Sequence, residues 1–103
     1  MKDITVEEWK SLIANDDNAV ILDVRTQDEV DEGALENAHH IDIYLGQGFI
    51  EEVKKLDTAK NYYIYCRSGN RSGQACAIMG QLGFENTYNM LGGYTAWAEE
   101  LED

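Results

Sequence analysis

The sequence contains no proline among its 103 residues, so glycine, capping side chains and Asn or Asp have to set its helix ends and turns. Only two cysteines are present, Cys66 and Cys76, and their spacing argues against a disulfide scaffold and for a reducing compartment. No apolar run approaches the length of a membrane span, and no signal-peptide pattern follows Met1. We therefore expect a cytoplasmic protein that does not associate with membranes.

Basic residues are also scarce. Eight Lys and Arg stand against 20 Asp and Glu, and the formal net charge is -12. A balance this acidic argues against a nucleic-acid partner and against an anionic membrane surface. The chain has only three arginines, Arg25, Arg67 and Arg71, and the last two lie close to Cys66. Guanidinium groups gathered beside one cysteine in an acidic protein predict an anion-binding site there.

What the chain does contain is typical of a globular protein. Hydrophobic residues make up 44% and charged residues 27% of the sequence, values that predict a packed core rather than disorder. The length fits one domain, which we expect to span residues 1–103.

Helix and strand patterns alternate along the chain. Two capping boxes, Thr5 with Glu8 and Thr26 with Glu29, predict helix starts, and the segment before Thr5 is expected to lead directly into the first helix. Helical spacing of apolar residues, which includes Leu12 in the first helix, predicts further helices at 49–56, 75–82 and 94–101. Apolar or aromatic runs predict strands at 19–22, 40–43, 62–66 and 86–90. This alternation predicts an α/β fold with a mostly parallel central sheet and helices on both faces.

The segment most informative about chemistry is residues 66–73, CRSGNRSG, between a predicted strand and a predicted helix. Sites in α/β sheets form outside the carboxyl ends of strands. Two glycines and several small polar residues allow the loop to curl into a nest of inward-pointing amides, and a thiol there would have a lowered pKa. The candidate nucleophile is Cys66, and the candidate anion-binding residues are Arg67, Ser68, Gly69, Asn70 and Arg71.

The structural alternative is that Cys66 is an ordinary buried cysteine at the end of a core strand. The composition of the loop weighs against it, because a packing cysteine has no need of two arginines and two glycines in the next seven residues. Reactive cysteines, by contrast, occupy electropositive surroundings.

Three segments together resemble the rhodanese family. Residues 66–72 resemble its active-site loop, residues 22–25 with Glu29 and Gly33 resemble its first signature, and residues 91–97 resemble its C-terminal signature. The matches follow the expected order and span most of the chain, so the resemblance implies a complete rhodanese domain. One departure is Glu36, which stands where the family commonly has proline, and there we expect a looser turn.

The resemblance implies a thiosulfate sulfurtransferase that needs no cofactor. Cys66 would take the outer sulfur of thiosulfate or of a persulfide donor and would pass it to cyanide or a thiol. The amides of residues 67 to 71 would hold the persulfide, and Arg71, with Arg67 as a second candidate, would bind the donor sulfonate. Small-molecule donors and acceptors are the expected partners, and a protein donor or acceptor remains open.

Two other functions compete with this one. A cysteine phosphatase also surrounds an anion with a thiolate and an arginine, but its loop has five residues between them, whereas four separate Cys66 from Arg71. A non-catalytic interaction module of the same fold is the other alternative, typical of chains that have lost the cysteine.

Residues outside the loop receive weaker assignments. Asp23 and Arg25 could border the pocket, but we favour a supporting role in which Arg25 pairs with Glu29. Cys76 is expected to face the core rather than to act as a resolving thiol. The adjacent pair His39 and His40 has no evident third ligand, so no metal site is expected.

Overall fold

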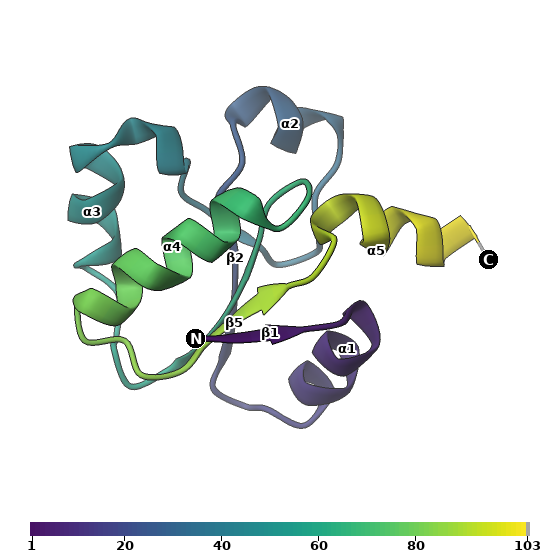
Figure 1. Ribbon diagram of the computed structural model, residues 1–103, viewed down its shortest axis with the longest axis horizontal. Helices are drawn as coiled ribbons and strands as arrows, with labels where there is room; N and C mark the ends of the chain where they lie inside the picture. The colour runs from purple at the N-terminus through teal and green to yellow at the C-terminus, as the bar shows by residue number, and fades with distance from the viewer. Residues whose placement is uncertain (103) are drawn as a thin grey trace.

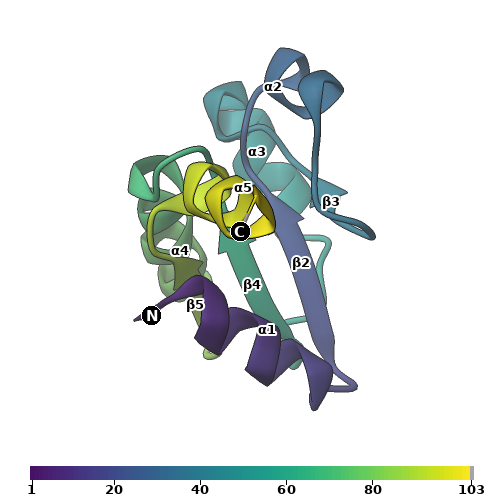
Figure 2. The same cartoon turned by 90° about the vertical axis from the view of Figure 1, so that its right-hand side faces the viewer.

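The computed structural model describes residues 1–102, and the side chains of residues 1–100. Five strands form one sheet in the order β1-β5-β4-β2-β3, and every neighbouring pair runs parallel (Figures 1 and 2). The strands are β1 (Lys2–Ile4), β2 (Ala19–Asp23), β3 (His39–His40), β4 (Asn61–Tyr65) and β5 (Thr87–Met90). The predicted α/β fold with a parallel sheet is confirmed.

Helices connect the strands, as the sequence pattern predicts. They are α1 (Val6–Ala14), α2 (Gln27–Glu32), the 3-10 turn η1 (Ile43–Leu45), α3 (Gln47–Val53), α4 (Asn70–Gln81) and α5 (Gly93–Glu102). Both predicted capping boxes form, and each threonine side chain accepts from the amide three residues on. No helix among residues 1–102 is both long enough and apolar enough to cross a membrane.

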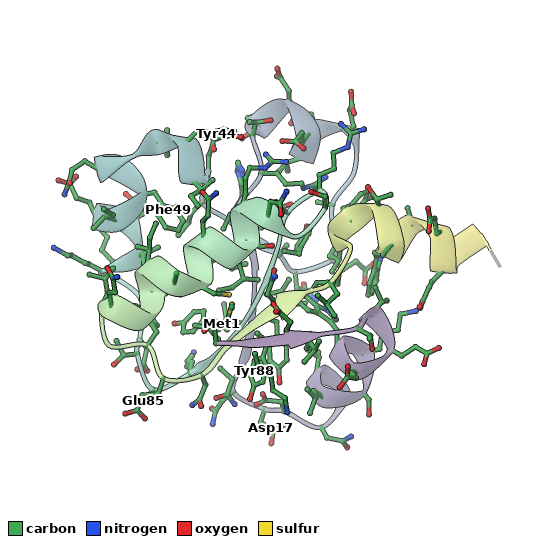
Figure 3. The ribbon with its side chains drawn as sticks, in the orientation of Figure 1. Met1, Asp17, Tyr44, Phe49, Glu85 and Tyr88 are labelled. Atoms are coloured by element: carbon green, nitrogen blue, oxygen red, sulfur yellow. The ribbon has the colours of Figure 1, made fainter. Side chains whose placement is uncertain are left out.

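The sheet has a hydrophobic core on each face. Helices α3 and α4 cover one face, where Phe49 and Met79 pack against strand residues such as Ile64. Helices α1 and α5 cover the other face, around Trp9 and Tyr65 (Figures 1 and 2). Figure 3 shows Phe49 in the layer between α3 and α4. The prediction of helices on both faces is therefore confirmed.

Three local expectations are wrong. Residues Lys2–Ile4 form an edge strand, because backbone pairing with β5 extends a segment that is too short to show a strand pattern. The strand expected at 40–43 is only His39–His40, since Asp42 caps η1 by accepting from the Tyr44 amide at 2.8 Å. Leu12, expected on the core face of α1, is 40% exposed.

The turn with Glu36 in the place of proline still closes. The Ala38 amide donates to the Leu35 carbonyl at 3.3 Å, and Asn37 adopts a positive φ of 63°. Asparagine tolerates this left-handed conformation better than most residues. The turn is thus hydrogen-bonded without proline.

Because the strands are parallel, their carboxyl ends all lie along the same edge of the sheet. Strand β4 ends at Tyr65, so Cys66 is the first residue beyond that edge. Its loop to α4 lies between α2 and the start of α5 (Figure 1). Edges of this kind, outside the carboxyl ends of strands, are where α/β folds place their binding sites.

Candidate active site

The Cys66 sulfur is surrounded by hydrogen-bond donors from the loop that follows it. The Gly69 amide donates to Sγ at 3.0 Å, and the Ser72 hydroxyl lies 3.3 Å from Sγ. Gly69 has a φ of 105°, which glycine adopts without strain, and it is the N-cap residue directly before α4. The chain therefore turns back on itself so that the N-terminus of α4 faces the sulfur.

This setting favours the thiolate. Burial raises the pKa of the Cys66 thiol. Hydrogen bonds from the Ser72 hydroxyl and from the amides of Ser72, Gly69 and Ser68 lower it by more, so the pKa lies below its ordinary value. The positive end of the α4 dipole acts in the same direction. The Gly69 amide, the Ser72 hydroxyl and the N-terminus of α4 therefore all face the sulfur of the candidate nucleophile.

The glycine pair at the start of α5 holds the other side of the loop. The Tyr94 amide donates to the Cys66 carbonyl at 2.8 Å, and the Thr95 amide donates to the Arg67 carbonyl at 3.1 Å. Gly93 has a φ of 56°, and a β-carbon there would lie 2.5 Å from the Cys66 carbonyl oxygen. A side chain at Gly93 would therefore push the loop out of place.

Arg71 forms an ion pair. Its Nη1 and Nη2 donate to Glu29 Oε1 and Oε2 at 2.6 and 2.8 Å. This bidentate contact lowers the pKa of Glu29 to about 2 and raises the pKa of Arg71. The Tyr44 ring, which Figure 3 shows between η1 and α2, has its centroid 5.6 Å from the guanidinium carbon. Arg71 thus ties α4 to α2 at the rim of the site.

Arg67 differs from Arg71 in its surroundings. It is exposed, and it makes no hydrogen bond or ion pair through its side chain with any residue that the structure describes. It lines a cavity of about 370 Å³ between α2 and α5, to which Glu29, Tyr94 and Glu99 also contribute. Arg67 therefore places a guanidinium group in a cavity whose other charged residues include Glu29 and Glu99.

Asp23 and Arg25 are buried together behind the loop. Arg25 Nη2 donates to Asp23 Oδ2 at 2.8 Å and to the Gly33 carbonyl at 2.7 Å, and the Tyr65 hydroxyl donates to Asp23 Oδ2 at 2.6 Å. The expected pairing of Arg25 with Glu29 is wrong, because Arg71 occupies the Glu29 carboxylate. The network fixes the ends of β2 and β4 against each other.

The second cysteine sits in a different environment. Cys76 on α4 is buried, and burial raises the pKa of its thiol to about 12, although a hydrogen bond with Thr87 opposes the rise. A thiol of this kind remains protonated at neutral pH. The expectation that Cys76 faces the core is confirmed.

The structure brings some of the predicted site residues together and leaves others at the surface. Ser68 and Asn70 are exposed, and Ser68 acts on the sulfur through its backbone amide. Cys66 has 0% exposure, so a donor reaches its sulfur only when side chains at the rim shift.

Two residues near the sulfur were not predicted as site residues. Ser72 bonds to Sγ, and Asn89 on β5 accepts from Ser72. The sequence carries one signal for Asn89: it is a polar residue in a segment predicted to be a buried strand.

The comparisons with known proteins point to one family. A family model described as "Rhodanese-like domain" matches residues 5–100. The chain is 38% identical to YtwF of Bacillus subtilis, over 99% of this chain and 95% of the relative. It is 33% identical to a sulfurtransferase of Allochromatium vinosum, over 95% and 89%. It is 32% identical to the thiosulfate sulfurtransferase GlpE of Coxiella burnetii, over 89% and 81%.

A solved structure gives the same result. The rhodanese-related protein of Thermoplasma volcanium superimposes with a TM-score of 0.83 at 31% identity, covering 97% of this chain and 93% of that one. Similarity in sequence and similarity in fold therefore both extend over most of the chain.

Proposed function

This chain belongs to the rhodanese-like domain family, and we propose that it is a sulfurtransferase that carries a sulfane sulfur as a persulfide on Cys66. The observation that carries the proposal is the arrangement around Sγ: the Gly69 amide at 3.0 Å, the Ser72 hydroxyl at 3.3 Å and the N-terminus of α4. These groups favour a thiolate, which is the nucleophilic form of cysteine.

In the first step, the Cys66 thiolate attacks the outer sulfur of thiosulfate. A new S–S bond forms to Sγ, the bond between the outer sulfur and the sulfonate sulfur breaks, and its electron pair leaves with sulfite. The outer sulfur then carries the negative charge of a persulfide. The amides of residues 67 to 71 that turn inward would hold this anion.

In the second step, a nucleophilic acceptor takes the outer sulfur. Cyanide gives thiocyanate and a thiolate gives a persulfide, and in both cases the electron pair of the broken S–S bond returns to Sγ. The amides and hydroxyl that lower the pKa of Cys66 also make its sulfur a better leaving group. One set of donors thus serves both halves of the cycle.

The donor sulfonate meets two arginines in different states. Arg67 is exposed and unpaired among the described side chains, so it offers the first contact for a dianion. Arg71 already holds Glu29, and it reaches the donor only by sharing or exchanging that carboxylate. We therefore assign initial donor binding to Arg67 and the contact closest to Sγ to Arg71.

The rival functions receive less support. A phosphatase ring would have one more residue between the cysteine and the arginine than the four found here. A non-catalytic module would have no use for a cysteine of lowered pKa. A sulfur carrier that is loaded by another protein's persulfide is compatible with the same site. One relative, YrkF of Bacillus subtilis, is named as a sulfur carrier protein.

Intact-protein mass spectrometry under non-reducing conditions tests the proposal. Incubation with thiosulfate should give a form heavier by one sulfur atom, about 32 Da, which cyanide reverses. Cys66→Ser should abolish the adduct, whereas Cys76→Ser should keep it. If neither thiosulfate nor a small persulfide donor gives an adduct, the sulfurtransferase proposal is wrong. Turnover of aryl phosphates would identify a phosphatase instead.

A further inference from the structure

A chain of hydrogen bonds runs from the nucleophile to the far edge of the sheet. The Ser72 hydroxyl on α4 lies 3.3 Å from Cys66 Sγ and donates to Asn89 Oδ1 on β5. Asn89 Nδ2 donates to the Gly69 carbonyl at 3.2 Å and to Asp3 Oδ1 on β1 at 3.0 Å. Ser72 and Asn89 are 0% and 5% exposed, so solvent does not substitute for these partners.

The orientation of the Asn89 amide follows from these partners. Both of its N–H groups face acceptors, a carbonyl oxygen and a carboxylate oxygen. A flipped amide would place Oδ1 against those two acceptors and lose both bonds. Oδ1 therefore faces Ser72, where it requires a donor.

Ser72 has one hydroxyl proton and two neighbours that can accept it. When Cys66 is a thiol, its S–H donates to Ser72 Oγ and the Ser72 proton goes to Asn89 Oδ1, so all three groups are satisfied. When Cys66 is a thiolate, the Ser72 proton turns to Sγ, and Asn89 Oδ1 is left buried without a donor. A buried acceptor without a partner is costly.

We propose that Asn89 is a positioning residue for the nucleophile: its amide oxygen competes with the Cys66 sulfur for the single hydroxyl proton of Ser72. Asn89 therefore opposes the thiolate, while the loop amides favour it. Nucleophilicity rises with thiol pKa, so this competition keeps the Cys66 thiolate more reactive toward a donor sulfur than the amide nest alone would. This consequence rests on the proposed role of Cys66 as the sulfur carrier.

Other ionisable groups also act on the sulfur, but the Ser72 hydroxyl bonds only to Cys66 and Asn89 among the described residues. Charged and titratable groups on the elements around the loop include Asp3, Asp23, Arg25, Glu29, Glu32, Tyr44, Tyr65, Arg67, Arg71, Cys76, Tyr94 and Glu99. The charge of Arg71 favours the thiolate. A test has to separate the hydroxyl from these groups, and removing Ser72 does so.

The test is the pH dependence of iodoacetamide alkylation of Cys66, which needs no sulfur donor. Ser72→Ala should move the inflection up by about one pH unit, a tenfold change in the thiolate equilibrium, because the thiolate loses a donor. Asn89→Ala should move it down by a similar amount, because the hydroxyl proton is released to Sγ. In the Ser72→Ala background, Asn89→Ala should have no effect.

Asn89→Asp is the second variant, for the case that Asn89→Ala does not fold. Its carboxylate keeps an oxygen in the place of Oδ1 and accepts the Ser72 proton more strongly. Its negative charge also opposes the thiolate, so the inflection should rise, and it should rise more with Ser72 present than in the Ser72→Ala background. A downward shift in this variant overturns the proposal. An unchanged or raised inflection in Asn89→Ala also overturns the proposal. So does an equal shift on Asn89→Ala with and without Ser72, because that result would indicate that Asn89 acts through Gly69. The alkylation experiment titrates only the Cys66 thiol. Its result can therefore be interpreted even if the sulfur-transfer assay fails.

Discussion

Arg71 and Glu29, 42 residues apart in the sequence, form a bidentate ion pair with contacts of 2.6 and 2.8 Å. The pair joins the first turn of α4, which presents amides to the nucleophilic sulfur, to α2 on the opposite side of the site. The arginine expected to bind an anionic donor is therefore already balanced by a carboxylate. Both the stability of the site and its use of thiosulfate should depend on Glu29.

The free energy of unfolding should fall in acid because the Arg71–Glu29 ion pair is lost. The pKa of Glu29 is depressed to about 2, so the contribution of its carboxylate is present above the unfolded value near 4.5 and is lost as the pH falls toward 2. Glu29→Gln should remove this part of the dependence. Urea midpoints of wild type and variant between pH 5 and about 2 measure it. Parallel curves for the two proteins would contradict the prediction.

Glu29→Gln should also improve thiosulfate use. The amide keeps an oxygen that can accept from Arg71 but removes the negative charge that opposes a dianionic donor. We expect KM for thiosulfate to fall several-fold and kcat to change less. Glu32→Gln is the matched control, because Glu32 lines the cavity without bonding to Arg71. An increase in KM would mean that Glu29 serves mainly to position Arg71.

Cys66 should titrate below an ordinary thiol. Its lowered pKa predicts that the alkylation rate rises with pH and levels off below about 8.5, the pKa of an ordinary thiol. Because Cys76 has a pKa raised to about 12, native protein should be modified once, at Cys66. Peptide mapping identifies the modified cysteine, and an inflection at or above the pKa of an ordinary thiol would count against an activated nucleophile.

Cys76 should matter for packing alone. Cys76→Ser places a hydroxyl in a buried position beside Thr87 and should lower the denaturation midpoint while leaving the rate of sulfur transfer nearly unchanged. Cys76→Ala, which adds no polar group, serves as the control. Loss of transfer in a folded Cys76→Ala protein would instead establish Cys76 as a resolving thiol.

Asp23 and Arg25 should be essential for stability. Their side chains are 1% and 4% exposed, and Asp23→Ala would leave the Arg25 guanidinium buried without its main partner. Breaking a buried ion pair in this way costs about 3–5 kcal/mol. Lys10→Ala, which removes an exposed pair with Glu100, should cost about 1 kcal/mol or less. Denaturant unfolding of the two variants compares them, and similar losses would place Asp23 outside the stabilising network.

By itself, the sequence determined the features that depend on neighbours along the chain. Capping boxes at Thr5 and Thr26 start helices through bonds that span three residues, and the aromatic run before Cys66 forms a strand for similarly local reasons. The loop after Cys66 is equally local, since Gly69, the amides and the helix start all lie within a few residues of the thiol. For this reason the strand, the turn at Gly69 and the helix start around the candidate nucleophile could be predicted without a structure.

Only the tertiary structure decided which side chains meet across the sheet. Arg25 pairs with Asp23, and Arg71 pairs with Glu29, although the sequence spacing favoured a pair between Arg25 and Glu29. The β1 strand exists because β5 supplies its hydrogen bonds, and that pairing brings Asp3 to Asn89 and Asn89 to Ser72. Contacts between residues 17 to 86 positions apart depend on strand order and register, and one residue's shift in register would send Asn89 to the opposite face.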